Sequence, residues 1–197
     1  MKYDLKSTSP NNQRLEEHSR PDDWIVKFLQ EAEVGHIATR WDDQPFITPS
    51  TFWYEQGKHE IYFHSNISGR VRANAERHAQ VCFEAMRVGQ PLPSNVALEF
   101  SIQYASVVAF GKIRVVEDEA EKKSALYGLI DKYFPKMSAG KEYRPITEKE
   151  LARTSVYSIS IESWSGKENW KDQADQSDEW DPLPLELLSL RKVSSSE

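Results

Sequence analysis

The chain has 197 residues, a formal net charge of −6 and an apolar fraction of 39%. A chain of this length can bury one sizeable core. Its acidic balance disfavours a nucleic-acid partner and an anionic membrane surface, because both attract basic proteins. The single cysteine, Cys82, excludes a disulfide within the chain and a zinc site built on several thiolates.

No window of the sequence approaches the length of a membrane span. Residues 1–20 are polar and contain no apolar stretch that could serve as the core of a signal peptide. We therefore expect a cytoplasmic protein without a membrane partner. We interpret residues 1–20 as a flexible N-terminal arm, residues 21–170 as the folded domain and residues 171–197 as an acidic C-terminal tail.

The first half of the predicted domain opens with a helix and continues as an antiparallel meander. The helix begins at Pro21, where Asp22 or Asp23 can cap the first turn. The period of the apolar residues then changes to that of strands, which short polar turns separate. We predict these strands at residues 36–40, 45–54 and 59–64.

The second half contains the remaining strands and the clearest helix. A helix at 117–134 opens with acidic residues and is stopped by Pro135, and Thr147 with Glu150 has the spacing of a capping box. The loop 89–95 contains glycine and two prolines and is predicted to be irregular. Further strands are predicted at 81–86, 100–116 and 156–162, and a helix at 69–78. Six mainly antiparallel strands with inserted helices predict a small barrel.

The segment 61–72 carries the strongest sign of ligand chemistry. A strand ends there in a hydroxyl-rich loop that opens a helix, and a helix N-terminus favours an anion through its free N–H groups and dipole. Ser65, Ser68 and the N–H groups of Gly69 and Arg70 can converge on one point, where Arg70 adds a fixed positive charge. The segment predicts a phosphate site, and a solvated basic helix is the alternative.

Three further segments have side chains suited to a flat ring. Small residues around Ser106 and Val107 allow a ligand to lie against the strand, where Ser106 can bond a ring carbonyl or nitrogen. Residues 49–53 can face a planar ring, and Trp164 can stack on one while Lys167 reaches a phosphate. The alternatives are, in turn, a plain barrel wall, strand core and a turn with a solvated lysine.

His64 is the candidate catalytic residue. It ends a predicted strand beside the phosphate loop, and a neutral imidazole there can hydrogen-bond a cofactor or move a proton. A half-buried histidine bonded to backbone is the alternative. We expect His36 to be structural. His18, His59 and His78 have no ligand spacing, so no metal site is predicted.

Taken in order, these segments resemble the pyridoxamine-phosphate-oxidase-related flavoprotein superfamily, and most of all its nitroimidazole-resistance-protein-like branch. The resemblance covers residues 21–168. The matching segments are 34–39, 44–49, 61–65, 68–70, 104–111 and 165–167. It implies an FMN-binding split β-barrel that forms a homodimer, with two FMN sites at the interface between the subunits.

The resemblance also implies roles for individual residues. The residues expected to hold the FMN phosphate are His64, Ser65, Ser68 and Arg70, with Gly69 giving access. Those expected along the isoalloxazine ring or beside the flavin are Ser50, Thr51, Phe52, Ser106, Val107, Trp164 and Lys167. Pyridoxamine-phosphate oxidases have Ser-Arg-Lys where this chain has Ser68-Gly69-Arg70, and their C-terminal substrate segment is not recognisable here. Both departures argue against vitamin B6 oxidation.

We therefore expect an FMN-dependent oxidoreductase. It would pass electrons from a nicotinamide nucleotide or another reductant to a small organic acceptor. The chain has no Gly-x-Gly-x-x-Gly fingerprint, so a nicotinamide would bind transiently over the flavin. A non-catalytic protein that binds or sequesters flavin is one alternative, and a haem- or deazaflavin-binding member of the same fold is another.

Overall fold

A computed structural model describes residue 4 and residues 6–188. The strands are β1 (Ser19–Arg20), β2 (Gly35–Trp41), β3 (Gln44–Ser50), β4 (Trp53–Glu55), β5 (Glu60–Asn66), β6 (Gln80–Leu92), β7 (Ser101–Val115) and β8 (Thr154–Asn169). The helices are the 3₁₀ helix η1 (Glu16–His18), α1 (Asp22–Glu31), α2 (Arg70–Arg77), α3 (Glu119–Tyr133), α4 (Glu148–Leu151) and α5 (Leu185–Leu188).

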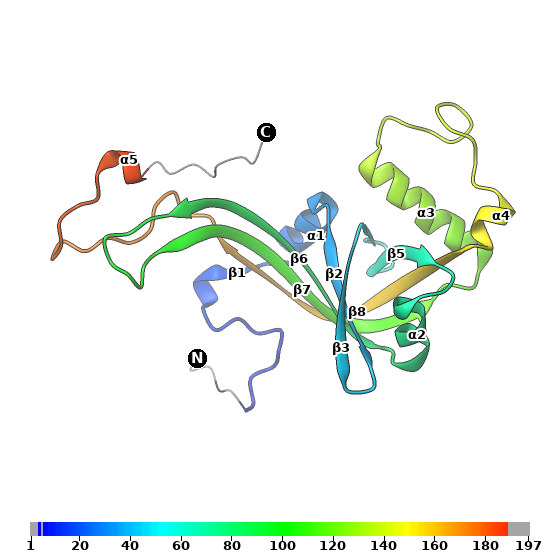
Figure 1. Ribbon diagram of the computed structural model, residues 1–197, viewed down its shortest axis with the longest axis horizontal. Coiled ribbons are helices and arrows are strands. Elements are labelled where there is room, and N and C mark those ends of the chain that lie inside the picture. The colour runs from blue at the N-terminus through cyan, green and yellow to red at the C-terminus, as the bar shows by residue number, and fades with distance from the viewer. Residues whose placement is uncertain (1–3, 5, 189–197) are drawn as a thin grey trace.

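The strands form one antiparallel sheet in the order β3-β2-β6-β7-β8-β5-β4, with β1 paired to β8 (Figure 1). This confirms the predicted fold class, a mainly β, antiparallel fold with inserted helices. The sheet has eight strands where six were predicted. Its end strands, β3 and β4, do not pair with each other, so the barrel is split open.

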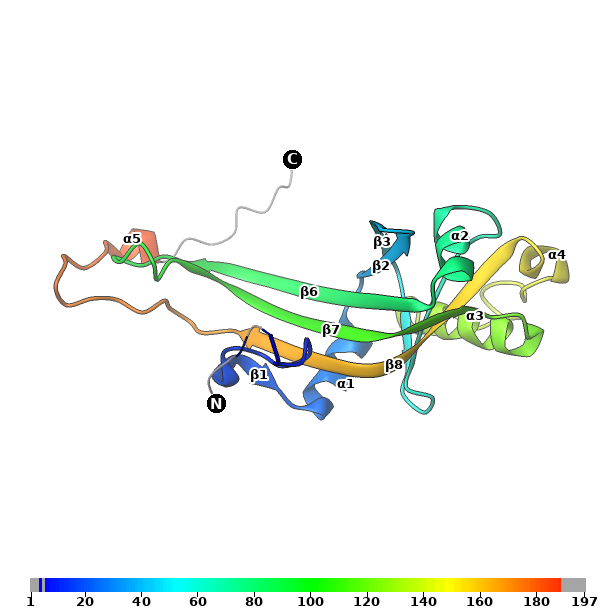
Figure 2. The same ribbon diagram turned by 90° about the horizontal axis from the view of Figure 1, so that it is seen from below.

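The molecule is elongated because three strands are much longer than the rest. Figures 1 and 2 show β6, β7 and β8 running away from the part of the sheet that α1, α2 and α3 cover. We call residues 86–92, 101–106 and 164–169 the extended half of the sheet. In it Met86 pairs with Ser106, and Ser106 pairs with Lys167.

Apolar side chains pack on both faces of β5. Ile61 and Phe63 belong to the main core, which also contains Phe83 and residues of α1. Tyr62 belongs to a second cluster with Ala125 of α3. The two faces of the strand predicted at 59–64 thus pack in different clusters, and α3 is the element that covers the second face.

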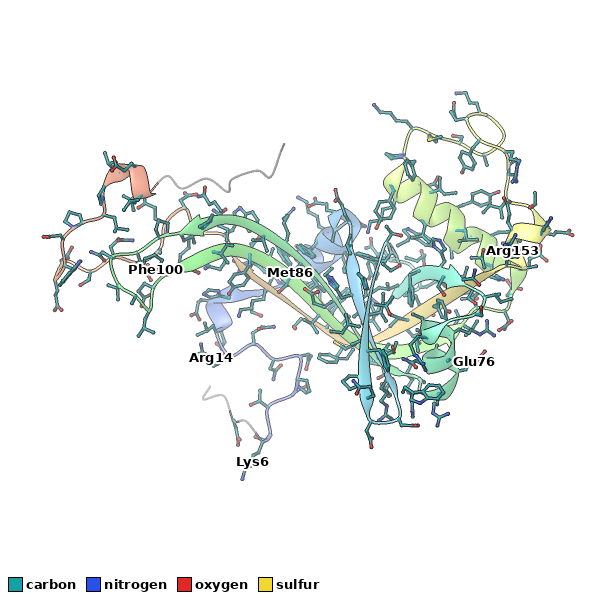
Figure 3. The ribbon with its side chains drawn as sticks, viewed as in Figure 1. Lys6, Arg14, Glu76, Met86, Phe100 and Arg153 are labelled. Carbon is teal, nitrogen blue, oxygen red and sulfur yellow. The ribbon has the colours of Figure 1, made fainter. Side chains whose placement is uncertain are left out.

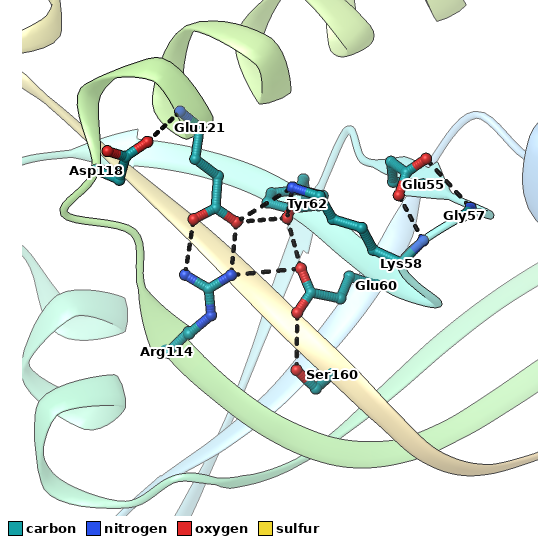
Figure 4. Close-up of polar contacts among 9 residues, drawn as sticks. All are labelled: Glu55, Gly57, Lys58, Glu60, Tyr62, Arg114, Asp118, Glu121 and Ser160. Atoms are coloured by element: carbon teal, nitrogen blue, oxygen red, sulfur yellow. Dashed lines mark hydrogen bonds and ion pairs between the residues drawn. The ribbon is translucent and has the colours of Figure 1, made fainter.

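A polar network fixes α3 on the sheet (Figure 4). The Arg114 guanidinium makes two hydrogen bonds to the Glu121 carboxylate, at 3.1 and 2.5 Å, and also contacts Glu60. The Tyr62 hydroxyl lies 2.6 Å from Glu121. The hydrogen bond from Arg114, followed by that from Tyr62, lowers the pKa of Glu121 to about 2 despite partial burial. Burial, together with both carboxylates, raises the pKa of Tyr62.

The strand predicted at 45–54 is two strands. β3 ends at Ser50 and β4 begins at Trp53, because Phe52 turns into the core and packs edge-on against Phe83 with a ring separation of 4.8 Å. The Tyr133 hydroxyl satisfies the backbone of Phe52 in place of a neighbouring strand. Alternation alone does not reveal such a break, because an aromatic residue suits a strand equally well.

The prediction of an irregular loop at 89–95 is also partly wrong. β6 continues to Leu92 through Gly89 and Pro91, with a shift of register between Val88 and Pro91. A proline is tolerated on an edge strand or at a bulge. This stretch is such an edge, since β2 pairs with β6 only at residues 82–84.

The ends of the domain contain more structure than predicted. β8 has 16 residues, and the last of them pair with β7 and β1. Ser19–Arg20, in the segment expected to be a flexible arm, forms β1. In the segment expected to be an acidic tail, Asp175 and Ser177 accept hydrogen bonds from Ser94 and Asn95.

The helix termini follow the predictions in part. The capping box of Thr147 and Glu150 is confirmed. At α1 the predicted cap by Asp22 or Asp23 is wrong, because the N-cap is Pro21 and no side chain caps it. In the described part of the chain, no helix has both the length and the apolar character needed to cross a membrane.

Candidate functional site

A pocket of about 610 Å³ lies between α3, the end of β5 and the loop 134–147. We call it the α3 pocket. Its apolar wall consists of Leu126, Leu129, Ile130, Phe134 and Ile146. Its polar and aromatic groups are Thr51, His64, Tyr133, Tyr143, Arg144, Glu150 and Thr154. A concave, mostly apolar pocket of this size with few polar groups is typical of a small-molecule site.

The predicted site residues His64 and Thr51 meet in this pocket. His64 is on the face of β5 that α3 covers, and Thr51 lies in the interruption between β3 and β4. His64 is partly exposed, yet the surrounding walls desolvate it and lower its pKa. The imidazole is therefore neutral at pH 7, which suits hydrogen bonding at either ring nitrogen.

The predicted phosphate loop borders a second pocket of about 420 Å³, which we call the α2 pocket. Ser68 and Gly69 line it together with Arg72, Glu76 and Glu117. Thr154, which pairs with Asn66, lines both pockets. The two pockets are therefore adjacent, on either side of the first residue of β8.

Among the described residues, no side chain caps the N-terminus of α2. Its N-cap is Gly69, and its first turn has no acidic residue, whereas α1, α3 and α4 each have two. Gly69 has φ +150°, and a Cβ built there would meet nothing within 4 Å. The free N–H groups and this open space fit an anionic ligand group.

Arg70 is the basic group at this terminus without a carboxylate partner in the described residues. Its guanidinium stacks over Trp41 and Phe46, at 4.8 and 5.3 Å from the ring centroids. Arg72 is instead paired with Glu76 and Glu117. Stacking therefore holds Arg70 on the side of the β2–β3 hairpin, away from the residues that line the α2 pocket.

Other predicted residues near this loop make local contacts. The Ser65 hydroxyl lies 2.9 Å from the Tyr157 hydroxyl on the core face of β5. The Ser68 backbone N–H donates to the Asn66 side chain at 3.2 Å. The Ser50 hydroxyl donates to the carbonyl of Thr51. Phe52 is fully buried, so its side chain does not line the α3 pocket.

The remaining predicted residues lie far from this loop in the same chain. Ser106 pairs with Lys167 in the extended half, whereas Ser65 pairs with Ser155 at the other end of β8. At about 3.3 Å per residue, the two pairs are roughly 40 Å apart along the strand. Val107 is fully buried in the core. Within a single chain, the predicted residues therefore lie in two separate groups.

Trp164 stands apart from both groups. Its indole N–H donates to Asp22 at 2.8 Å, and its ring lies edge-on to His59 with a centroid separation of 4.5 Å. These contacts connect β8 to α1 and to the turn before β5. These contacts of Trp164 are therefore with α1 and with the turn before β5, and with neither group of predicted residues.

A third pocket, of about 440 Å³, contains a histidine that the sequence indicated only as structural. It is lined by Phe28, Val34, His36, Met86 and Arg87, with residues 31–33. His36 Nδ1 lies 2.9 Å from the Glu84 carboxylate. In the described residues, no group of three or more His, Cys, Asp and Glu side chains could hold a metal ion.

The sequence reasoning missed the α3 residues that form the apolar pocket wall. Helical spacing places Leu126 and Ile130 on the same edge of the helix as Ala125 and Leu129, yet both are only partly buried. Helical spacing shows that residues share a face, but it does not show whether that face meets the core or a cavity. The loop 134–147, which contributes Tyr143, Arg144 and Ile146, has no periodic signal.

Comparison with solved structures identifies similar folds. A flavocytochrome from Azotobacter vinelandii has a TM-score of 0.75 at 25% identity, over 85% of this chain and 76% of that chain. An FAD- and haem-binding protein from Mycobacterium smegmatis has a TM-score of 0.72 at 23% identity, over 81% and 76%. A candidate 5-nitroimidazole antibiotic resistance protein from Bacteroides thetaiotaomicron has a TM-score of 0.64 at 19% identity, over 75% and 84%.

The structures below 25% identity show the fold alone. No curated protein matches the chain. A family model described as pyridoxamine 5'-phosphate oxidase matches residues 21–168, which is most of the folded part. The match covers every helix and strand from α1 to α4 and nearly all of β8, and so includes both groups of predicted site residues. The chain therefore belongs to the pyridoxamine 5'-phosphate oxidase family.

Proposed function

We propose that this chain is an FMN-dependent oxidoreductase that acts on a small organic acceptor, as a cytoplasmic homodimer. One observation supports this more than any other. The α3 pocket, with His64 and Thr51 on its wall, shares Thr154 with the α2 pocket, which Ser68 and Gly69 at the uncapped start of α2 line. A pocket suited to a ring and a site suited to an anion therefore lie next to each other. FMN requires both, because it has a ring system and a phosphate group in one molecule.

Charge indicates on which side of the loop the phosphate would bind. The α2 pocket contains the carboxylates of Glu76 and Glu117, and Arg72 is already paired with both. With Lys122 also on its wall, this pocket has no net charge to attract a dianion, whereas Arg70, on the hairpin side, has no carboxylate partner among the described residues. We therefore place the phosphate at the N–H groups of the first turn of α2, on the side of Arg70.

His64 and Thr51 would contact the ring system. Neutral His64 can donate a hydrogen bond from one ring nitrogen and accept one at the other, and can move a proton to a bound acceptor. The Thr51 hydroxyl offers a donor and an acceptor. Bound FMN would supply the electron transfer itself. The apolar residues of α3 would exclude water from the same space.

In a homodimer, the two groups of predicted residues could come together at one site. A two-fold axis can bring the Ser106 and Lys167 region of one chain to the α2 loop of its partner, which one chain cannot do across roughly 40 Å. The extended half and the turn beyond it also expose Met86, Leu98 and Phe100, at 50%, 92% and 62%. Figure 3 labels Met86 and Phe100 on this part of the molecule. Exposed apolar groups on this scale are typical of a protein interface.

The solved structures give independent support for a flavin. The flavocytochrome from Azotobacter vinelandii, with 25% identity over 85% of this chain, is by its name a flavin protein. Family membership and this likeness favour a flavin over the other cofactor classes. The choice of FMN rests on the resemblance of the phosphate loop and is part of the proposal.

Titration of the purified protein with FMN, followed by flavin fluorescence and visible absorption, tests the cofactor. We expect saturable binding at one FMN per chain. Anaerobic mixing of the loaded protein with NADH or NADPH then separates an oxidoreductase, whose flavin bleaches, from a flavin-sequestering protein, whose flavin stays oxidised. A protein that binds no FMN would overturn the proposal.

His36 supports haem binding as a second candidate function. Its Nδ1 contacts Glu84, which leaves Nε2 as the ligating atom, and a carboxylate partner of this kind orients histidine ligands in metal proteins. Met86, a second residue type that ligates haem iron, lines the same pocket. Two of the similar structures are a flavocytochrome and an FAD- and haem-binding protein.

Haemin titration tests this candidate without reference to FMN. If haem binds at His36, a Soret band appears and saturates, and His36→Ala abolishes it. His18→Ala is the matched control, because His18 contacts Tyr104 and lies outside this pocket. A Soret band that survives His36→Ala would exclude this site.

A further inference from the structure

The α3 pocket has a wall without net charge. Five of its residues can ionise, namely His64, Tyr133, Tyr143, Arg144 and Glu150. Desolvation lowers the pKa of His64, and burial raises the pKa of Tyr133, so both side chains are neutral at pH 7. The pKa of Tyr143 is also raised, which keeps its phenol neutral.

The remaining two charges cancel each other. Arg144 makes two hydrogen bonds to the Glu150 carboxylate, at 2.9 and 2.6 Å. Glu150 is itself fixed, because it accepts hydrogen bonds from the backbone N–H and the hydroxyl of Thr147, both at 2.9 Å. A bidentate pair of this geometry leaves Arg144 little free charge to offer a second anion.

The rest of the wall is uncharged: it consists of five apolar residues and the two threonines Thr51 and Thr154. Leu126, Leu129 and Ile130 come from α3, and Phe134 and Ile146 from the loop that follows. An anion that entered this space would lose water without gaining a free cation, which is unfavourable. A ring compound without charge would lose only apolar hydration, and its transfer is favourable.

We propose that the α3 pocket binds the electron acceptor and selects an uncharged compound of one or two rings over its carboxylated or phosphorylated counterpart. The acceptor role rests on the proposed function: the flavin ring would contact His64 and Thr51 at one side of the pocket, and the acceptor would occupy the remaining space against the apolar residues of α3. The pair of Arg144 and Glu150 is the element that sets this preference. In this respect the pocket differs from a site for a phosphorylated vitamin.

Isothermal titration calorimetry with two probes of nearly the same shape tests the selectivity. 1-Naphthamide is neutral and 1-naphthoate is an anion, and neither reacts with a flavin. We expect the wild-type protein to bind the amide at least about tenfold more tightly than the carboxylate. Equal affinities, or tighter binding of the carboxylate, would overturn the proposal.

Glu150→Gln tests the role of the pair. Glutamine keeps the capping box of α4 but removes the charge that neutralises Arg144. Affinity for 1-naphthoate should rise about fivefold, as expected for a solvent-exposed charge pair, while that for 1-naphthamide stays within about twofold. Glu148→Gln is the matched control, since Glu148 lies on the same helix but outside the pocket wall. An unchanged preference in Glu150→Gln would exclude this mechanism of selection.

Ile130→Trp tests the location, and FMN binding is measured separately in each variant. The tryptophan should fill the pocket and abolish 1-naphthamide binding while FMN still binds. Leu126→Ala widens the pocket and should weaken the binding of 1-naphthamide about fivefold. This second variant keeps the location testable if Ile130→Trp does not fold. Loss of FMN in both variants would mean that the flavin itself fills the pocket, which overturns this inference but not the proposed function. A wild-type protein that binds the probes as expected but no FMN would remove the acceptor role.

Discussion

The Tyr133 hydroxyl lies 3.1 Å from both the backbone nitrogen and the carbonyl oxygen of Phe52. It also donates to the carbonyl of Glu33 at 2.6 Å. One side chain at the end of α3 thus holds the interruption between β3 and β4 and the loop before β2. Since Thr51 lies in that interruption, Tyr133 positions one wall of the α3 pocket while lining it itself.

Tyr133→Phe should lower the free energy of unfolding by about 1–3 kcal/mol, because backbone groups of Phe52 and Glu33 lose their partner. Urea denaturation followed by tryptophan fluorescence measures the change. Tyr143→Phe is the control, since no hydrogen bond of its hydroxyl occurs among the described residues and its effect should stay within about 0.5 kcal/mol. Equal effects of the two substitutions would contradict the role given to Tyr133.

Acid should destabilise the protein through Glu121. Its pKa is lowered to about 2 in the folded state, first by the hydrogen bond from Arg114, from an ordinary value near 4.5. A carboxyl group with a lowered folded pKa stabilises the fold above its unfolded pKa, and this contribution is lost as the pH falls from about 4.5 to 2. After allowance for the solvent around half-exposed Arg114, the free energy of unfolding should fall by about 2 kcal/mol over this pH range.

Chemical denaturation of the wild type and of Glu121→Gln between pH 7 and pH 2 measures this linkage. Glu121→Gln should be less stable at pH 7, and the two curves should converge near pH 2. Glu117→Gln is the control, because the side chain of Glu117 is 80% exposed and comes no closer than 3.5 Å to Arg72, so this ion pair should contribute little stability. A constant difference between wild type and Glu121→Gln over the whole range would refute the assignment.

Arg70→Ala should weaken FMN binding by about 1.5–3 kcal/mol, the range for a hydrogen bond to a charged group. Fluorescence titration with FMN measures it. Arg77→Ala is a close control, since both guanidinium groups stack on Trp41, but Arg77 is paired with Asp42 at 2.8 Å. If both substitutions weaken binding equally, the stack with Trp41 matters and the free charge of Arg70 does not.

A site shared between two protomers can be tested by complementation. Arg70→Ala and Lys167→Ala should each weaken FMN binding when present alone. When the two variants are unfolded together and refolded, half of the dimers are mixed, and each mixed dimer has one site with both residues intact. We expect about a quarter of the sites to regain tight binding. No recovery would mean that the site lies within one chain or that Lys167 does not contribute.

Most of the fold follows from local patterns. Alternating residues predicted β5 and the first part of β8, an acidic first turn with a proline stop predicted α3, and the spacing of Thr147 and Glu150 predicted the capping box. The errors occur where tertiary contacts override the pattern. Phe52 leaves its strand because Phe83 and Tyr133 receive it, and β6 passes through Pro91 because that edge has no second partner there.

The candidate site was predictable where one segment contains all of its chemistry. The start of α2 is continuous in sequence, and so Ser68, Gly69 and Arg70 could be recognised together. The stack of Arg70 on Trp41 could not, because 29 positions of chain separate the two residues and no local period relates them. The same holds for the wall that Leu126 and Ile130 present to His64. Whether these groups hold FMN stays a prediction.

The turn at the end of β6 is buried by a part of the chain that the family pattern does not include. Leu92, Pro93 and Ser94 are all buried, and residues 174–177 supply the covering backbone and side chains. These covering residues lie beyond residues 21–168, which match the family. Residues 174–177 thus complete the end of the sheet that is farthest from α1, α2 and α3 (Figure 2), and their removal would expose Leu92, Pro93 and Ser94 to solvent while the part of the fold that matches the family stayed intact.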